Sequence, residues 1–184
     1  GAARIGRAVQ RRIAFGIGQH HDQPDRRLYM VFEILVGGIG GVVANFGEPL
    51  RPARTSETGD DEPLAEARML AAESGGIRMI CVYAPNGRLV GSPFYEAKLV
   101  WFDRLARWIE EAVTPETPAV IGGDFNVAPA DIDVWDPRAC HGGTHVSERE
   151  RQAFRRLSSA GFVDAYRLHH PEPGRYTWWD YRAG

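Results

Sequence analysis

The stretch Ile121-Gly-Gly-Asp-Phe-Asn-Val-Ala-Pro129 decides how this sequence is interpreted. The apolar run 119–121 stops at two glycines, and two polar side chains follow, Asp124 and Asn126. Side chains two apart in an extended backbone point to the same face, so a strand end would present a carboxylate beside an amide. That pair suits a hard cation, a phosphate oxygen or an attacking water. A plain turn explains this stretch equally well, because Gly, Asp and Asn are common turn formers.

A second stretch, residues 78–87, ends in the same way. It reads RMICVYAPNG, an apolar strand that finishes in Tyr83, Asn86 and Gly87. Two strands that both end in polar, loop-forming residues are what a site at one edge of a sheet requires. The second stretch therefore favours a functional site over a plain turn.

Five segments, in this order, resemble the endonuclease/exonuclease/phosphatase superfamily, in particular bacterial exodeoxyribonuclease III and its apurinic-site endonuclease relatives. They are residues 81–87 (CVYAPNG), 122–129 (GGDFNVAP), 133–137 (DVWDP), 144–148 (THVSE) and 176–182 (YTWWDYR). The resemblance runs from about Phe46 to Gly184. It implies an α/β fold, a two-sheet sandwich flanked by helices, truncated at the C-terminus and atypical at the N-terminus. Residues 46–184 would form a partial catalytic domain, and residues 1–45 a segment of unknown role.

The resemblance also implies roles for single residues. Asp124 would orient or deprotonate the attacking water, Asn126 would hold the phosphate or the metal, and Tyr83 would stabilise developing charge. The ion would be Mg²⁺, with Mn²⁺ as the alternative, bound by Asp124 and Asn126. Asn86 and Trp178 would contact nucleic acid, although a core position is an equal alternative for Trp178.

The implied activity is Mg²⁺-dependent phosphodiester hydrolysis in DNA, by a 3′-to-5′ exodeoxyribonuclease and abasic-site endonuclease of base excision repair. The partner would be double-stranded DNA with abasic sites or 3′ ends, and the protein would be a cytoplasmic monomer. Two alternatives stay open. One is an inactive fragment or a module that only binds phosphate or DNA, and the other is a phosphoesterase acting on a sugar or lipid phosphate. Segments 133–137 and 177–181 favour the DNA branch over the last of these.

Several features of the family are missing from the sequence. A complete member opens with a Trp-Asn strand and a Gln-Glu pair whose glutamate is the main metal ligand, and residues 1–45 contain neither. It closes with an Asp and a Ser-Asp-His segment, which would fall beyond Gly184. Impaired activity is therefore expected. A frameshift is one hypothesis for residues 1–45; another reading frame upstream of Phe46 would then encode the two missing motifs.

The composition sets wide bounds on function. The chain has 184 residues, 43% hydrophobic and 25% charged, as in an ordinary globular domain. A net charge of -2 neither supports nor excludes nucleic acid as a partner. Cys81 and Cys140 lack the spacing of a zinc or disulfide framework. Because no apolar run reaches the roughly 20 residues of a membrane helix, no membrane partner is expected.

Local patterns predict further elements. Ser74-Gly-Gly76 followed by a strand predicts a hairpin, although the composition of residues 66–74 also suits a helix. A helix is predicted over residues 92–113, capped by Ser92 and with Pro93 at its first position. Its expected apolar face is Trp101, Leu105, Trp108, Ile109 and Ala112, with Lys98, Asp103, Arg104 and Glu110 off that face.

A second helix is expected to open at Ser147, because Ser147 and Glu150 have the spacing of a capping box, and Gly161 would end it. In the first 45 residues the predicted element is a strand over residues 28–36. The paired histidines His20 and His21 are assigned to a solvated loop, since neighbours in a strand point apart.

Overall fold

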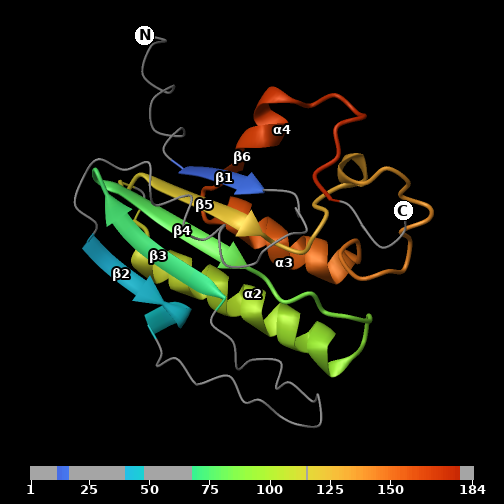
Figure 1. Ribbon diagram of the computed structural model, residues 1–184, viewed down its shortest axis with the longest axis horizontal. Coiled ribbons are helices and arrows are strands. Elements are labelled where there is room, and N and C mark those ends of the chain that lie inside the picture. Colours follow the sequence, from blue (N-terminus) through green and yellow to red (C-terminus); the bar gives the residue numbers. More distant parts are fainter. Residues whose placement is uncertain (1–11, 17–39, 48–67, 115, 179–184) are drawn as a thin grey trace, which may run out of the picture.

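The computed structural model describes residues 12–16, 40–47, 68–114 and 116–178. They form a six-stranded sheet in the order β2-β3-β4-β5-β1-β6 (Figure 1). The strands are β1 (Arg12–Gly16), β2 (Gly40–Ala44), β3 (Met69–Ser74), β4 (Ile77–Tyr83), β5 (Ala119–Asp124) and β6 (Val163–Asp164). The helices are α2 (Pro93–Ala112), α3 (Glu148–Ser159) and α4 (Ala165–His169), with short 3-10 turns at η1 (Asn45–Gly47) and η2 (Asp131–Asp133).

The sheet is mixed, and its parallel part positions the site. β4, β5, β1 and β6 are parallel neighbours, whereas β2, β3 and β4 pair antiparallel. The carboxyl ends of β4 and β5 therefore reach the same edge of the sheet. Figure 1 shows the loops that follow these two strands together at the end to which both arrows point.

The predicted hairpin is confirmed, and the helical alternative is wrong for the described residues, because Met69–Ser74 form a strand. β3 and β4 pair from Met69 with Val82 to Ser74 with Ile77. Gly75 and Gly76 connect them with φ values of +58° and +76°. Two positive φ angles in a two-residue loop match the twist of a β-hairpin, and glycine adopts them without steric cost.

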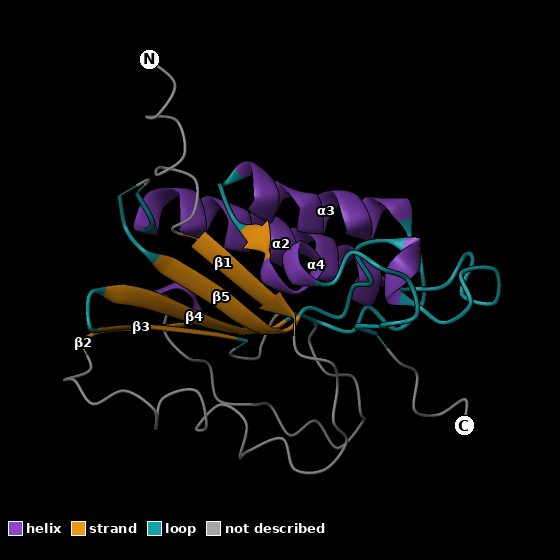
Figure 2. Cartoon of the chain, turned by 90° about the horizontal axis from the view of Figure 1, so that it is seen from above, coloured by secondary structure: helices purple, strands orange, loops and turns teal. Residues whose placement is uncertain are grey.

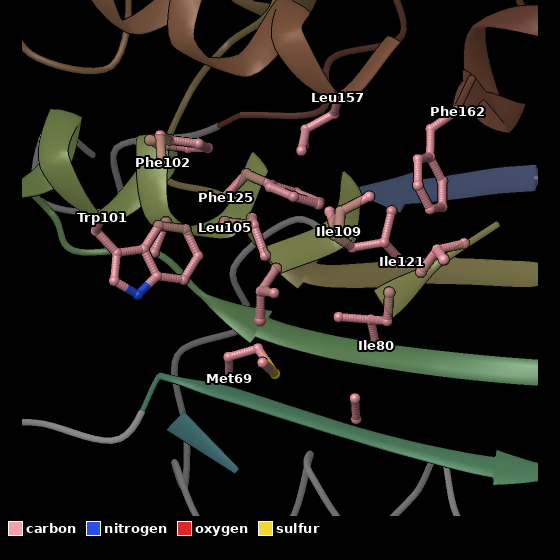
Figure 3. Packing of buried hydrophobic residues seen from close by; sticks show 14 of the residues in the cluster. Met69, Ile80, Trp101, Phe102, Leu105, Ile109, Ile121, Phe125, Leu157 and Phe162 are labelled. Carbon is pink, nitrogen blue, oxygen red and sulfur yellow. The ribbon is translucent and has the colours of Figure 1, made fainter. Parts of the chain in front are cut away.

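Helix α2 confirms the prediction for residues 92–113. The Ser92 hydroxyl accepts a hydrogen bond from the backbone N–H of Tyr95 at 3.2 Å, and Pro93 opens the helix. Trp101, Leu105 and Ile109 are each at most 3% exposed. Figure 3 shows these side chains in one cluster with residues of the strands and of α3. At about 1.5–3 kcal/mol for each large apolar side chain, this face fixes α2 on the sheet.

One assignment on α2 is wrong. Lys98 was expected off the apolar face, but its side chain is fully buried. Its spacing explains the burial, because residues 98, 101 and 105 are related as i, i+3 and i+7 and share one helix face. The buried ammonium is possible because a carboxylate from α3 neutralises it.

Helix α3 confirms the predicted capping box. The Ser147 hydroxyl accepts from the Glu150 backbone N–H, and the Glu150 carboxylate accepts from the Ser147 N–H at 3.2 Å. The helix ends at Ser159, just before Gly161. Its buried side carries Leu157 into the same core as α2.

The α/β class is confirmed. Figure 2 shows α2 and α3 on one face of the sheet, and the buried residues of β3, β4 and β5 pack against them. Within the described ranges there is one open, mixed sheet, and the second sheet of the predicted sandwich is not observed there. No helix of these ranges is long and apolar enough to cross a membrane.

Two strands from the first 45 residues were missed by the sequence patterns. β1 lies between β5 and β6, and β2 pairs with β3 at the sheet edge. β1 is too short, at five residues, to show a clear period of its own. The strand predicted over residues 28–36, and His20 and His21, lie outside the described residues.

Candidate active site

Tyr83 and Asp124 end two adjacent parallel strands and are register partners across them. The residues before them in each strand, Val82 of β4 and Gly123 of β5, are also paired. Alternation along β4 and β5 turns Ile80, Val82 and Ile121 into the core at 0–3% exposure. The side chains of Tyr83 and Asp124 therefore share the opposite face. Tyr83 is 49% exposed, so a phenol and a carboxylate stand together at an accessible edge.

Asn126 joins this edge through a turn, so the expectation of an extended pair is wrong. β5 ends at Asp124, and Asn126 has a φ of +51°. The Asp124 carboxylate accepts a hydrogen bond from the Asn126 backbone N–H at 2.8 Å. The Asn126 amide donates to the Ala84 carbonyl at 2.8 Å, which ties the loop after β5 to the loop after β4. The two predicted residues are brought together, but Asn126 lies deeper, at 2% exposure.

Asn86 lies against Asn126. Its side-chain amide donates to the Asn126 Oδ1 at 3.5 Å, and its own Oδ1 accepts from the Arg88 backbone N–H at 3.1 Å. Four of the five predicted site residues thus form one group, Tyr83, Asn86, Asp124 and Asn126, here called the polar edge.

His145 lies against the polar edge, a position that the sequence analysis did not predict. Its Nδ1 lies 2.5 Å from the Asn126 carbonyl oxygen, and its Nε2 lies 3.4 Å from the Asn86 amide nitrogen. A carbonyl can only accept, so Nδ1 donates, and in the neutral ring Nε2 accepts from Asn86. His145 is 6% exposed and has a φ of +78°, an uncommon conformation for a non-glycine residue.

Trp178 packs on His145. Their ring centroids are 5.2 Å apart and tilted by 34°. Trp178 is half-buried, so it is neither a core residue nor fully exposed. The structure therefore brings the fifth predicted residue beside the polar edge, with His145 between them.

Asp133 holds the segment that carries Trp178. This carboxylate, 1% exposed, accepts from Arg167 Nε at 2.9 Å and from the Thr177 hydroxyl at 2.8 Å. Its backbone carbonyl accepts from the N–H groups of Thr177 and Trp178, each at 3.1 Å. Two of the motifs that carry the family resemblance, residues 133–137 and 176–182, thus meet at Asp133.

A buried ion pair lies beneath the polar edge. Lys98 Nζ donates to Glu150 Oε1 at 2.5 Å, and both side chains are fully buried. Glu150 also accepts from the Thr144 hydroxyl at 2.9 Å and from the His145 N–H at 3.0 Å. The predicted cap of α3 is therefore also the partner of Lys98, a contact that the spacing of the capping box does not reveal.

The surroundings of the pair lower the pKa values of both partners. Burial lowers the pKa of Lys98 below its usual value. The negative charge of Glu150 and its hydrogen bond with Lys98 raise this pKa, but they do not outweigh the effect of burial. Burial alone would raise the pKa of Glu150, but the charge of Lys98 and the hydrogen bonds from Lys98, Ser147 and His145 outweigh it, so this pKa lies below its usual value.

Arg68 adds positive charge on the exposed side. Its guanidinium carbon lies 5.0 Å from the centre of the Tyr83 ring, within range of a cation–π contact. A cation beside an exposed phenol suits an anionic ligand. Sequence patterns gave no signal for this residue, because it precedes β3 and reaches Tyr83 only through the hairpin.

The donor set at this edge fits a hard divalent cation in chemical type, since carboxylate and amide oxygens are its usual ligands. Asp124 is the better placed of the two predicted ligands, because Asn126 is almost fully buried. Among the residues that the structure describes, no three His, Cys, Asp or Glu side chains gather around a possible metal position. Mg²⁺ commonly takes only one or two carboxylates and completes its shell with water and substrate phosphates.

A phenol, a carboxylate and two amides at the carboxyl edge of parallel strands define an α/β protein with a polar site at one edge of its sheet. Comparison with known proteins specifies its family. Residues 11–184 match the Endonuclease/Exonuclease/phosphatase family. The protein belongs to this family.

Individual relatives agree with this placement. The exodeoxyribonuclease of Bacillus subtilis is 34% identical over 169 residues, which cover 91% of this chain and 66% of the relative. A solved 3′-5′ exonuclease (NExo) from Neisseria meningitidis is 37% identical with a TM-score of 0.65, covering 79% of this chain and 52% of that one. A solved AP endonuclease from Archaeoglobus fulgidus is 32% identical with a TM-score of 0.64, covering 80% and 52%. The chain thus spans about half to two thirds of the length of these relatives.

Proposed function

We propose that this chain carries the phosphate-binding edge of a divalent-metal-dependent DNA phosphodiesterase of exodeoxyribonuclease III type. The observation that supports it most is the register pairing of Tyr83 with Asp124, with Asn126 hydrogen-bonded to both strand ends. The relatives named exodeoxyribonuclease and AP endonuclease point to DNA with 3′ ends or abasic sites as the substrate.

Each residue of the proposed site has a task. Asp124 orients the attacking water and accepts its proton. Tyr83, with Arg68 beside it, stabilises the charge that develops on the phosphate. Asn126 orients Asp124 and contacts the phosphate or the metal, while Asn86 and Trp178 contact the DNA. These DNA contacts are backbone and stacking contacts, which suits a substrate recognised by its shape rather than by its sequence.

A divalent ion completes the proposed site. Nucleases of this family generally use one, and Asp124 with Asn126 would hold it. Mg²⁺ is the proposed ion, with Mn²⁺ as a substitute. When bound, it offsets negative charge on the scissile phosphate.

The test uses a duplex with one abasic site, incubated with Mg²⁺ or with EDTA. We expect cleavage with Mg²⁺, and a fall of about 100-fold or more in Asp124→Asn, the scale of a lost general base. Asp103→Asn is the matched control, because it removes an exposed carboxylate of α2 that pairs with the surface residues Arg107 and Arg156. Equal activity in Asp124→Asn and the wild type would refute the proposed role of Asp124.

Two other results would identify the alternatives. Binding of the duplex without cleavage would indicate a DNA-binding module, for which the small number of clustered metal ligands in the described ranges is the supporting observation. Hydrolysis of a small phosphate ester but not of DNA would indicate a phosphoesterase of the same family. Gel filtration of the same sample tests the proposed monomer.

A further inference from the structure

Lys98 is the only lysine in the sequence, and all other basic side chains except histidine are arginines. It is also fully buried, which is rare for a lysine unless it is paired. An arginine-rich chain that keeps one lysine, and keeps it in the interior, points to a need for the particular shape of an ammonium group.

That shape matches the three acceptors around it. Lys98 Nζ lies 2.5 Å from Glu150 Oε1, 2.6 Å from the Asn126 carbonyl oxygen and 3.3 Å from the Asn86 carbonyl oxygen. An ammonium has three N–H donors in a tetrahedral arrangement, one for each acceptor. A planar guanidinium would spread its donors in one plane over a wider area.

The three acceptors come from three separate parts of the chain. Asn86 follows β4, Asn126 follows β5, and Glu150 belongs to the first turn of α3. Two of them are the backbone carbonyls of proposed site residues. The contact on Asn126 acts where the backbone has a φ of +51°, a conformation that is uncommon outside glycine, asparagine and aspartate.

We infer that Lys98 is a positioning residue that fixes Asn86 and Asn126 relative to Asp124 for catalysis. It does not touch the substrate. This inference rests on the proposed DNA phosphodiesterase function. Loss of the ammonium would release two loop carbonyls at once, and a misplacement of about 1 Å at a reacting group can lower a rate about 100-fold.

The decisive comparison is between Lys98→Met and the double variant Lys98→Met/Glu150→Gln. Lys98→Met leaves a buried, unpaired carboxylate and should lower both thermal stability and kcat. The double variant removes that charge. The single acceptor oxygen of the glutamine amide keeps either the contacts of Oε1 with Thr144 and His145 or those of Oε2 with Ser147, so stability should recover in part. The two loop carbonyls still lack Lys98 as their donor, so kcat should stay about 100-fold below wild type although the double variant is more stable than Lys98→Met. Recovery of kcat together with stability would overturn the inference, since Lys98 would then be merely structural.

Hydrogen exchange separates this result from failure of the proposed function. In the double variant the amides of residues 84–88 and 125–128 should exchange faster than in the wild type, while those of α2 near Leu105 keep their protection. This measurement needs no DNA and no catalysis. If the wild type cleaves no DNA but these loops lose protection, the proposed function fails and the positioning role stands. Unchanged exchange in both loops would refute the positioning role even in an active enzyme.

Discussion

At the scale of single residues, Gly123 controls where Asp124 stands. A Cβ at this position would lie 1.9 Å from the Val82 carbonyl oxygen, and Gly123 has a φ of +131°. Only glycine fits such a close approach of two strand ends. The position of Asp124 at the polar edge therefore depends on glycine at residue 123.

We therefore predict that Gly123→Ala is strongly destabilising, by more than the roughly 1 kcal/mol of a positive φ alone, because the two paired strands must move apart. Gly75→Ala is the matched control: φ is +58°, but nothing lies within 4 Å of the added Cβ. Chemical denaturation of both variants measures the difference. Equal losses of unfolding free energy would show that strain, and not the clash with Val82, decides the effect.

At the scale of elements, the first turn of α3 joins fold and site through Glu150. Its pKa is lowered in the folded protein. A carboxylate with a lowered pKa adds stability that is fully present above its unfolded-state pKa, about 4.3, and that is lost as the pH falls through the lower folded-state value. As the pH falls below about 4.3, the Glu150 carboxylate is protonated in the unfolded protein before it is protonated in the folded protein, and the folded protein loses stability.

We predict that Glu150→Gln is less stable than the wild type at pH 7. The difference in unfolding free energy between the two proteins should become smaller as the pH falls below about 4. Urea unfolding across this range measures the gap. The exposed carboxylates Glu96 and Glu148 also have lowered pKa values, but they are present in both proteins and cancel in the comparison. A gap that stays constant with pH would contradict the assignment of the effect to Glu150.

At the scale of the whole molecule, β1 joins the two ends of the described chain. It pairs with β5 from Arg12 with Ala119 to Gly16 with Gly123, and with β6 on its other side. Without β1, β6 loses its partner strand and β5 gains an unpaired edge, which favours aggregation.

Deletion of residues 1–16 should therefore abolish cooperative unfolding or leave the protein insoluble, because β5 and β6 both lose the strand that lies between them. Circular dichroism melting and the soluble fraction after expression compare this variant with the wild type. A cooperative melt of the variant at the wild-type temperature would show that β1 is dispensable.

The parts of the fold that were predicted from the sequence are those with strong local signals. The paired glycines after Ser74, the cap at Ser92 and the capping box at Ser147 each fix a turn or a helix start by neighbouring residues alone. The proposed site residues come from motif segments, and the structure places four of them at one edge and the fifth beside it: Tyr83, Asn86, Asp124 and Asn126, with Trp178 on His145.

The parts that were missed depend on distant partners. The burial of Lys98 requires Glu150, 52 positions away, and the role of His145 requires Asn126 and Asn86. β1 is a strand only because β5 and β6 flank it. No local pattern contains these relations. The chain turns at Asn126, where an extended strand was expected, because the Asp124 carboxylate accepts a hydrogen bond from the backbone N–H of Asn126.

The position of β1 between β5 and β6 has a consequence for synthesis on the ribosome. This strand leaves the exit tunnel before the other strands of the sheet, and its partners, from Ala119 onward and at Val163, are translated long after it. Until then the nascent chain can complete the hairpin of β3 and β4, but not the sheet around it. Pairings between positions so far apart in the sequence form slowly. The unpaired strands are therefore exposed during synthesis, and we expect a chaperone to bind them in this interval.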